Sequence, residues 1–121
     1  MILETIDCDF SVCKTDNRSC PDVGGEFFFW EKTDEEISLV CPTDRVPKDV
    51  SAREDGFRAF RIKGTLDFSL IGILAPIAET LAQNKIGIFV VSTYNTDYVF
   101  VKSDKFSQAV RLLTEKGYAF I

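Results

Sequence analysis

Residues 64–102, GTLDFSLIGILAPIAETLAQNKIGIFVVSTYNTDYVFVK, hold a turn, one amphipathic helix and two strands in succession. Within this stretch, apolar residues recur at the i, i+3, i+4, i+7 spacing of a helix with one buried face, namely Leu70, Ile73, Leu74, Ile77, Ala78, Leu81 and Ala82. A proline costs least in the first helical turn, so Pro76 predicts that the regular helix begins near residues 72–74. Asp67 and Ser69, just upstream, are residue types that cap helices.

The start of this helix is a candidate binding point for an anionic group. Backbone N–H groups around Gly72, Ile73 and Leu74 have no helical partner there and lie at the positive end of the helix dipole. Because Gly72 has no side chain to obstruct a ligand, such an end attracts a carboxylate or a phosphate. The alternative is that the protein's own caps or water satisfy these N–H groups.

Two strands joined by a polar turn follow the helix. Residues 86–93 are apolar on both faces and rich in β-branched residues, which predicts a strand in the middle of a sheet. Residues 94–97 predict a hairpin turn, and residues 98–101 predict the antiparallel return strand. Asp97 has two interpretations: it caps the turn, or it binds the ammonium group or cationic tail of a ligand.

The first third of the chain predicts further strands, at residues 9–14, 27–30 and 37–41. Thr33 and Glu36 either form a capping box or close a hairpin between the last two of these strands. Residues 42–56 contain two prolines and mixed charges, which indicates a connector with one helical turn after Pro47. A weak internal repeat aligns the turn Thr33-Asp34 with the turn Thr96-Asp97.

The last part of the chain completes a recognisable order of elements. Residues 57–63 alternate as a strand, and Ser103 or Asp104 caps a second helix that ends at Gly117 and is followed by a short strand at 118–121. From residue 57 the order is strand, helix, strand, strand, helix, strand. This order predicts an α+β fold with the ferredoxin-like βαββαβ arrangement.

Composition excludes several classes of function. The net charge is −5, with no cluster of Lys or Arg, which argues against nucleic acid as a partner. No apolar run approaches the roughly 20 residues of a spanning helix, and the N-terminus does not resemble a secretory leader, so we expect no membrane and a cytoplasmic location.

The cysteines and the absence of histidine bear on catalysis and metals. The four cysteines, Cys8, Cys13, Cys20 and Cys41, form no CxxC pair, so we expect neither a structural metal nor a disulfide framework. Without histidine the chain lacks the commonest general base. The ionisable residues near the proposed site are Lys63, Lys85, Asp67 and Asp97. We therefore expect no enzyme and no cofactor.

Residues 64–101 resemble the ACT-domain family, in the branch related to the CASTOR-type amino acid sensors. The resemblance is densest in LDFS, in GILAPIA and in IFVVSTYNTDY. FFFWEKTDEEISLVCP, together with FSVC near the start, resembles the degenerate N-terminal ACT-like unit of the same proteins. The resemblance implies an ACT domain at residues 55–121 with a degenerate ACT-like half, residues 1–54, beside it.

The resemblance also implies a non-catalytic regulatory or sensor module that binds a small ligand, usually an amino acid, between adjacent ACT units. The residues that it implies for the ligand site are Leu70, Ile71, Gly72 and Ile73, with a second candidate segment that contributes Ser92, Thr93, Thr96 and Asp97. The alternative is a protein–protein interaction or oligomerisation module without a small ligand, because an exposed strand edge can pair with another chain.

Overall fold

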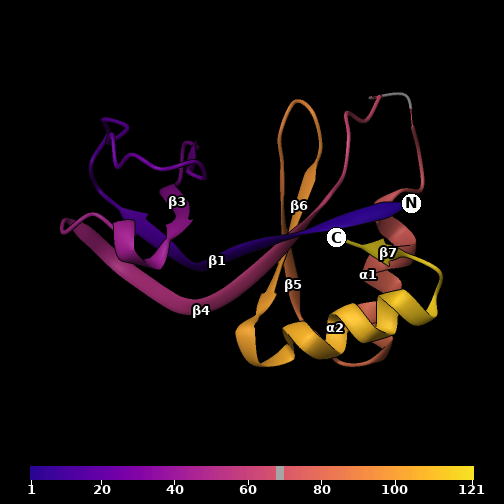
Figure 1. Cartoon of the computed structure of the whole chain (residues 1–121). Coiled ribbons are helices and arrows are strands. Elements are labelled where there is room, and N and C mark those ends of the chain that lie inside the picture. Colours follow the sequence, from indigo (N-terminus) through magenta and orange to yellow (C-terminus); the bar gives the residue numbers. More distant parts are fainter. Residues whose placement is uncertain (68–69) are drawn as a thin grey trace. The chain divides into compact units, whose positions relative to one another are not determined.

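The computed structural model describes residues 1–67 and 70–121 and shows a mixed α/β chain (Figure 1). Its elements in chain order are β1 (Ile2–Thr15), β2 (Phe29–Lys32), β3 (Ile37–Pro42), the 3-10 helix η1 (Thr43–Arg45), β4 (Val50–Ile62), α1 (Leu74–Gln83), β5 (Ile88–Ser92), β6 (Asp97–Lys102), α2 (Ser103–Glu115) and β7 (Ala119–Phe120). Neither helix in the described part has the length and apolar character needed to cross a membrane.

The chain divides into two compact units. Met1–Asp7 and Arg58–Ile121 form one, which we call the C-terminal unit, and Cys8–Phe57 form the other, the N-terminal unit. The long strands β1 and β4 each contribute residues to both units.

The C-terminal unit has the predicted ferredoxin-like order. After the last residues of β4 come α1, β5, β6, α2 and β7, and the strands lie in the order β7-β1-β4-β6-β5. The start of β1 is an addition that the sequence did not indicate: it runs parallel to β7, with Ile2 opposite Ala119, and Lys63 N donates to Ile2 O at 3.0 Å.

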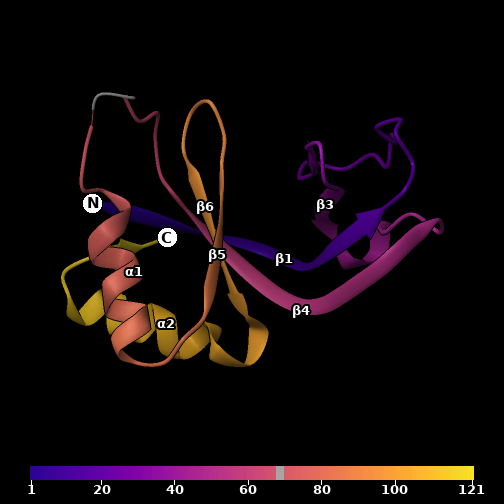
Figure 2. The ribbon, with the colours of Figure 1, turned by 180° about the vertical axis from the view of Figure 1, so that it is seen from behind.

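One hydrophobic core holds the C-terminal unit together. The buried face of α1 contributes Ile77 and Leu81, as its periodicity predicts, and α1 lies next to α2 (Figure 2). The other fully buried residues of this core are Leu3, Phe60, Ile62, Val99, Val101, Ala109 and Leu113. Burial of each of these side chains other than Ala109 contributes about 1.5–3 kcal/mol.

The prediction of a central strand at residues 86–93 is wrong. β5 is the end strand of the sheet order, and its residues from Ile88 to Val91 are only half-buried. Instead β6 is central, with Val99, Phe100 and Val101 fully buried. β5 is therefore more hydrophobic than is usual for a strand at the edge of a sheet.

Two other strand boundaries differ from the prediction. β4 begins at Val50, so residues 50–56 are not a connector; they are mostly exposed, and a solvated strand shows no hydrophobic alternation. β1 begins at Ile2 rather than near Asp9, because the buried residues Leu3 and Ile6 are three apart and break the two-residue period.

Two helix predictions also need correction. The helical turn predicted within residues 42–56 is η1, which precedes Pro47 instead of following it. Helix α2 includes Ser103 as its first residue, so Lys102 takes the cap position, and no described side chain caps the helix.

The N-terminal unit has the strand order β2-β3-β1-β4, with β2 and β3 forming a hairpin. Thr33 closes this hairpin: Thr33 N donates to Glu36 O at 2.9 Å, and the Thr33 hydroxyl accepts from Glu36 N at 3.2 Å. Of the two alternatives for Thr33 and Glu36, the structure thus shows the hairpin.

The turn between β5 and β6 repeats these bonds. Thr93 N donates to Thr96 O at 2.8 Å, and the Thr93 hydroxyl accepts from Thr96 N at 3.3 Å. The two turns therefore align Thr33 with Thr93, and the predicted alignment of Thr33 with Thr96 is shifted by three residues.

Candidate functional site

Two loops of the C-terminal unit are fixed to each other by hydrogen bonds. Leu66 N, in the loop before α1, donates to Asn95 O in the β5–β6 turn at 2.7 Å. In the same turn, the buried hydroxyl of Thr96 donates to Ile62 O at the end of β4, also at 2.7 Å. Moving the turn away from β4 would break this bond and leave the Ile62 carbonyl without this donor, which costs free energy. The bond therefore restrains the turn.

A cavity of about 210 Å³ lies between these loops. Apolar side chains line one part of it, from Leu66, Leu70 and Ile73. Polar and acidic residues line the rest, namely Asp67, Ser92, Thr93, Tyr94, Asn95, Thr96 and Asp97. A pocket with an apolar wall and a few convergent polar groups is the usual form of a small-molecule site.

Ser92 and Asp97 both line the cavity and are bonded to each other. They lie opposite each other in the β5–β6 ladder, and Ser92 Oγ donates a hydrogen bond to Asp97 Oδ1. A carboxylate accepts several hydrogen bonds, so the half-buried Asp97 retains capacity for a ligand. The charged residues among the described lining are Asp67 and Asp97, both acidic, so the cavity favours a cationic group.

The N-terminus of α1 borders the same cavity. The helix begins at Leu74, as predicted, and Ile73 occupies the cap position and lines the cavity. No described side chain caps this helix, and its first turn contains no acidic residue. Asp67 is therefore not a helix cap in the structure, and the expectation for Ser69 lies outside the described residues. The first N–H groups of α1 are the donors that a ligand carboxylate would need.

The structure brings together most, but not all, of the predicted site residues. Leu70, Ile73, Ser92, Thr93, Thr96 and Asp97 line the cavity, whereas Ile71 and Gly72 are not among the described lining residues. Ile71 is 90% exposed, and Gly72 has a left-handed backbone with φ 72° and open space where a Cβ would lie. Gly72 thus serves the turn into α1.

Sequence reasoning missed three residues of the cavity wall. Leu66, Tyr94 and Asn95 join it because the Leu66–Asn95 backbone bond draws the two loops together. A backbone bond between distant loops has no signature in residue type, although the polar run at 94–97 did indicate that a turn lies there.

Two of the four cysteines have buried side chains of low reactivity. Cys13 and Cys41 are buried, and burial raises the pKa of the Cys41 thiol to about 11 and also raises the pKa of Cys13. A raised pKa leaves little thiolate for nucleophilic chemistry. Among residues 1–67 and 70–121, no group of three or more His, Cys, Asp or Glu side chains is arranged to hold a metal ion.

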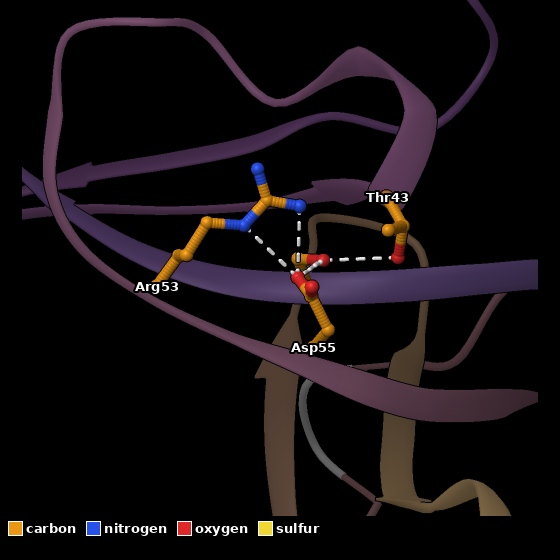
Figure 3. A network of polar contacts seen from close by, with 4 residues as sticks. Thr43, Arg53 and Asp55 are labelled. Atoms are coloured by element: carbon orange, nitrogen blue, oxygen red, sulfur yellow. Dashed lines mark hydrogen bonds and ion pairs between the residues drawn. The ribbon is translucent and has the colours of Figure 1, made fainter.

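A second polar cluster lies in the N-terminal unit (Figure 3). Asp55 accepts hydrogen bonds from the Ser11 hydroxyl and from Arg53 Nε and Nη2, the last two at 3.1 and 2.9 Å, and Thr43 lies 2.9 Å from the Ser11 hydroxyl. These donors, first Ser11 and then Arg53, lower the pKa of Asp55. The cluster links β1 to β4, and the lowered pKa makes the Asp55 carboxylate a weak base for the Ser11 hydroxyl, which indicates a structural role.

Comparisons with known proteins identify a matching family model and similar solved structures. The family model described as ACT domain matches residues 52–115. None of the curated proteins matches the sequence. The crystal structure of protein Atu0741 from Agobacterium tumefaciens is 31% identical, with a TM-score of 0.88 over 99% of this chain and 91% of that one.

Two more distant structures share the fold alone. Protein VC0802 of Vibrio cholerae, whose function is unknown, is 20% identical, with a TM-score of 0.68 over 92% of this chain and 85% of that one. The allosteric aspartate kinase of Clostridium acetobutylicum is 14% identical, with a TM-score of 0.65; the alignment covers 93% of this chain and 32% of the kinase.

Proposed function

Since this chain belongs to the ACT domain family, whose members are regulatory modules that bind small ligands such as amino acids, we propose that it is a non-catalytic sensor of an amino acid. The observation that carries this proposal is the cavity between the loop before α1 and the β5–β6 turn. Its acidic residues, its apolar residues and the uncapped helix start beside it correspond to the ammonium group, the side chain and the carboxylate of an amino acid.

The proposed pose follows from the chemistry of the walls. The ligand's ammonium group binds the carboxylate of Asp97, which Ser92 orients through its hydrogen bond. The ligand's carboxylate accepts hydrogen bonds from the first N–H groups of α1, at the positive end of the helix dipole. An apolar side chain of the ligand packs against Leu66, Leu70 and Ile73.

The size of the cavity supports a small ligand. Pockets for drug-sized molecules occupy roughly 300–1,000 Å³. The cavity of about 210 Å³ is below this range, so it suits a single amino acid better than a nucleotide or a dinucleotide.

The proposal extends to the N-terminal unit, Cys8–Phe57, which we infer to be a degenerate ACT-like copy of the kind found in CASTOR-type sensors. Two observations support this. Its strand order β2-β3-β1-β4 corresponds to β5-β6-β4-β7 with the start of β1 left out, and the two hairpin turns share their hydrogen bonds. Residues 16–28 take the place of the first helix and η1 that of the second.

The location of the ligand between adjacent ACT-like units stays a prediction. The cavity described here is formed by residues of the C-terminal unit alone. An adjacent unit would have to add contacts to those named above.

A thermal-shift screen against the common amino acids tests the proposal. A ligand present at 100 times its Kd stabilises the native state by about 2.7 kcal/mol, which raises the melting temperature measurably. We expect apolar amino acids to shift it most, and the matching amines and carboxylic acids, which lack one of the two charged groups, to shift it less. If no amino acid changes the melting temperature at millimolar concentration, the sensor proposal is wrong.

A further inference from the structure

A second cavity of the C-terminal unit, of about 450 Å³, borders the same β5–β6 turn as the first. Thr93, Asn95 and Thr96 line both cavities. We call the second one the sheet-face cavity. The residues of its wall that matter below are Glu4, Arg61, Lys63, Asn95 and Tyr98.

The sheet-face cavity lies on the face of the sheet away from the helices. Ile62 and Val99 belong to the core that α1 and α2 cover. Successive side chains of a strand point to opposite faces, so their neighbours Arg61 and Tyr98 lie on the other face. Arg61 on β4 bonds Glu4 on β1 and Tyr98 on β6, and these three strands are adjacent in the sheet. The three side chains therefore form one polar row across the sheet.

The guanidinium group of Arg61 is held in one orientation within this row. Arg61 Nε donates to Glu4 Oε1 at 2.9 Å, and Arg61 Nη1 donates to Tyr98 Oη at 2.9 Å. The Cζ atom of Arg61 also lies 5.7 Å from the centre of the Tyr98 ring. The Arg61 side chain keeps 31% of its surface exposed. A positive charge that is already ordered loses little conformational entropy when a ligand binds beside it.

Lys63 and Asn95 add polar groups that the protein itself does not use. Both are exposed, and among residues 1–67 and 70–121 neither the Lys63 ammonium nor the Asn95 side-chain amide makes a hydrogen bond or an ion pair. Arg61 and Lys63 bring two positive charges to the wall, against one negative charge from Glu4. The sheet-face cavity thus favours an anion, although the chain as a whole has a net charge of −5.

We propose that the sheet-face cavity binds a small molecule through an oxyanion, either a phosphate or a carboxylate group. The ammonium of Lys63 and the amide of Asn95 donate to the oxyanion, and the fixed charge of Arg61 attracts it. The carboxylate of Glu4 opposes the anion and so limits its affinity. Since pockets for drug-sized molecules occupy roughly 300–1,000 Å³, the cavity has room for the rest of the ligand.

This site differs from the proposed amino acid site in the charge of its wall. The first cavity contains Asp67 and Asp97 as its charged residues among the described lining, whereas the sheet-face cavity contains Arg61 and Lys63 beside Glu4. The proposal goes beyond the sensor function and does not depend on it.

A titration with sodium phosphate, followed through the backbone amide chemical shifts of the whole chain, tests the proposal. Sodium succinate forms the second arm, and sodium chloride at the same ionic strength is the control. We expect the amides of Lys63, Gly64 and Asn95 to shift and to saturate with phosphate or succinate, and the tighter of the two identifies the preferred group. Shifts at these amides that do not saturate in either arm, or that chloride reproduces, overturn the proposal.

Two substitutions should change the affinity for the tighter anion in opposite directions. Lys63→Gln removes a donor and a charge, and should weaken binding about tenfold. Glu4→Gln removes the opposing charge but keeps an acceptor for Arg61, and should strengthen binding. Lys105→Gln, which removes the same charge from an exposed position of α2, is the matched control and should leave binding unchanged.

The opposite signs separate a binding role from a general loss of structure, which would weaken binding in every variant. Circular dichroism shows whether each variant keeps the fold, and should Glu4→Gln unfold, Lys63→Gln alone decides. A folded Lys63→Gln variant that binds as tightly as Lys105→Gln overturns the proposal, and so does a folded Glu4→Gln variant that binds no more tightly than the wild type. No amino acid enters this experiment, so its failure is distinct from failure of the sensor proposal.

Discussion

Ser92 and Asp97 lie opposite each other where β5 and β6 enter their turn, and the Ser92 hydroxyl donates a hydrogen bond to the Asp97 carboxylate. This bond fixes the carboxylate of a residue that lines the cavity, together with the apolar residues Leu70 and Ile73. The sequence left two roles open for Asp97, and the bond to Ser92 serves both: it closes the strand end and it orients the oxygen that a ligand would meet.

Asp97→Asn should therefore weaken binding of the amino acid that the screen identifies. The substitution keeps the shape but removes the negative charge, and a hydrogen bond to a charged group contributes about 1.5–3 kcal/mol. We expect a loss of roughly 10- to 100-fold in affinity, measured by isothermal titration calorimetry. Asp104→Asn, which removes one charge in the first turn of α2, is the control. Equal affinities of the Asp97→Asn variant and the wild type would show that the Asp97 carboxylate does not bind the ligand.

Thr96→Val should destabilise the C-terminal unit through its buried hydroxyl. Thr96 is 8% exposed and donates to Ile62 O at 2.7 Å, so the valine leaves a buried carbonyl without this donor. The expected loss is about 1–3 kcal/mol in the free energy of unfolding, measured with urea. Thr114→Val, on the exposed side of α2, should change it by less than about 0.5 kcal/mol. A Thr96→Val variant as stable as its control contradicts the role of this bond.

The hairpin, the first helix and the loops around the cavity could be predicted from sequence because each has a local pattern. The periodicity around Ile77 fixes the helix, and Pro76 fixes its start within a turn. The polar run before Asp97 marks the β5–β6 turn. One of the two loops that line the cavity comes directly before this helix, and the other is that turn.

The remaining features depend on contacts between distant parts of the chain. Ile2 pairs with Ala119 and Leu66 N meets Asn95 O, and neither contact has a pattern within a single segment. The position of β5 within the sheet was mispredicted because the hydrophobicity of a strand does not determine which strands lie beside it. The exposed start of β4 was missed because a solvated strand resembles a polar connector.

Gly72→Ala and Gly87→Ala form a matched pair that tests the backbone at the entry to α1. In neither case does an added Cβ meet an atom within 4 Å, but Gly72 has φ 72° whereas Gly87 does not adopt a positive φ. The alanine at 72 should cost about 1–2 kcal/mol in the free energy of unfolding, since a left-handed backbone is unfavourable for L-residues. Alanine at 87 should be neutral or stabilise by up to about 1 kcal/mol. Equal effects at both positions would mean that the turn before α1 rearranges without cost.

The stability of the N-terminal unit should depend on pH through Asp55, whose pKa in the folded protein lies below its ordinary value of 3.8 because Ser11 and Arg53 donate to it. A carboxylate with a lowered pKa contributes stability that is fully present above the pKa of the unfolded state. That contribution is lost as the pH falls through the lower pKa of the folded state. Asp55→Asn should thus lower the urea midpoint at pH 6 and have a smaller effect near pH 3. An Asp34→Asn control, in the exposed β2–β3 turn, corrects for general charge effects. A difference between the Asp55→Asn variant and the wild type that stays constant from pH 6 to pH 3 would show that the ionised carboxylate does not stabilise the link between β1 and β4.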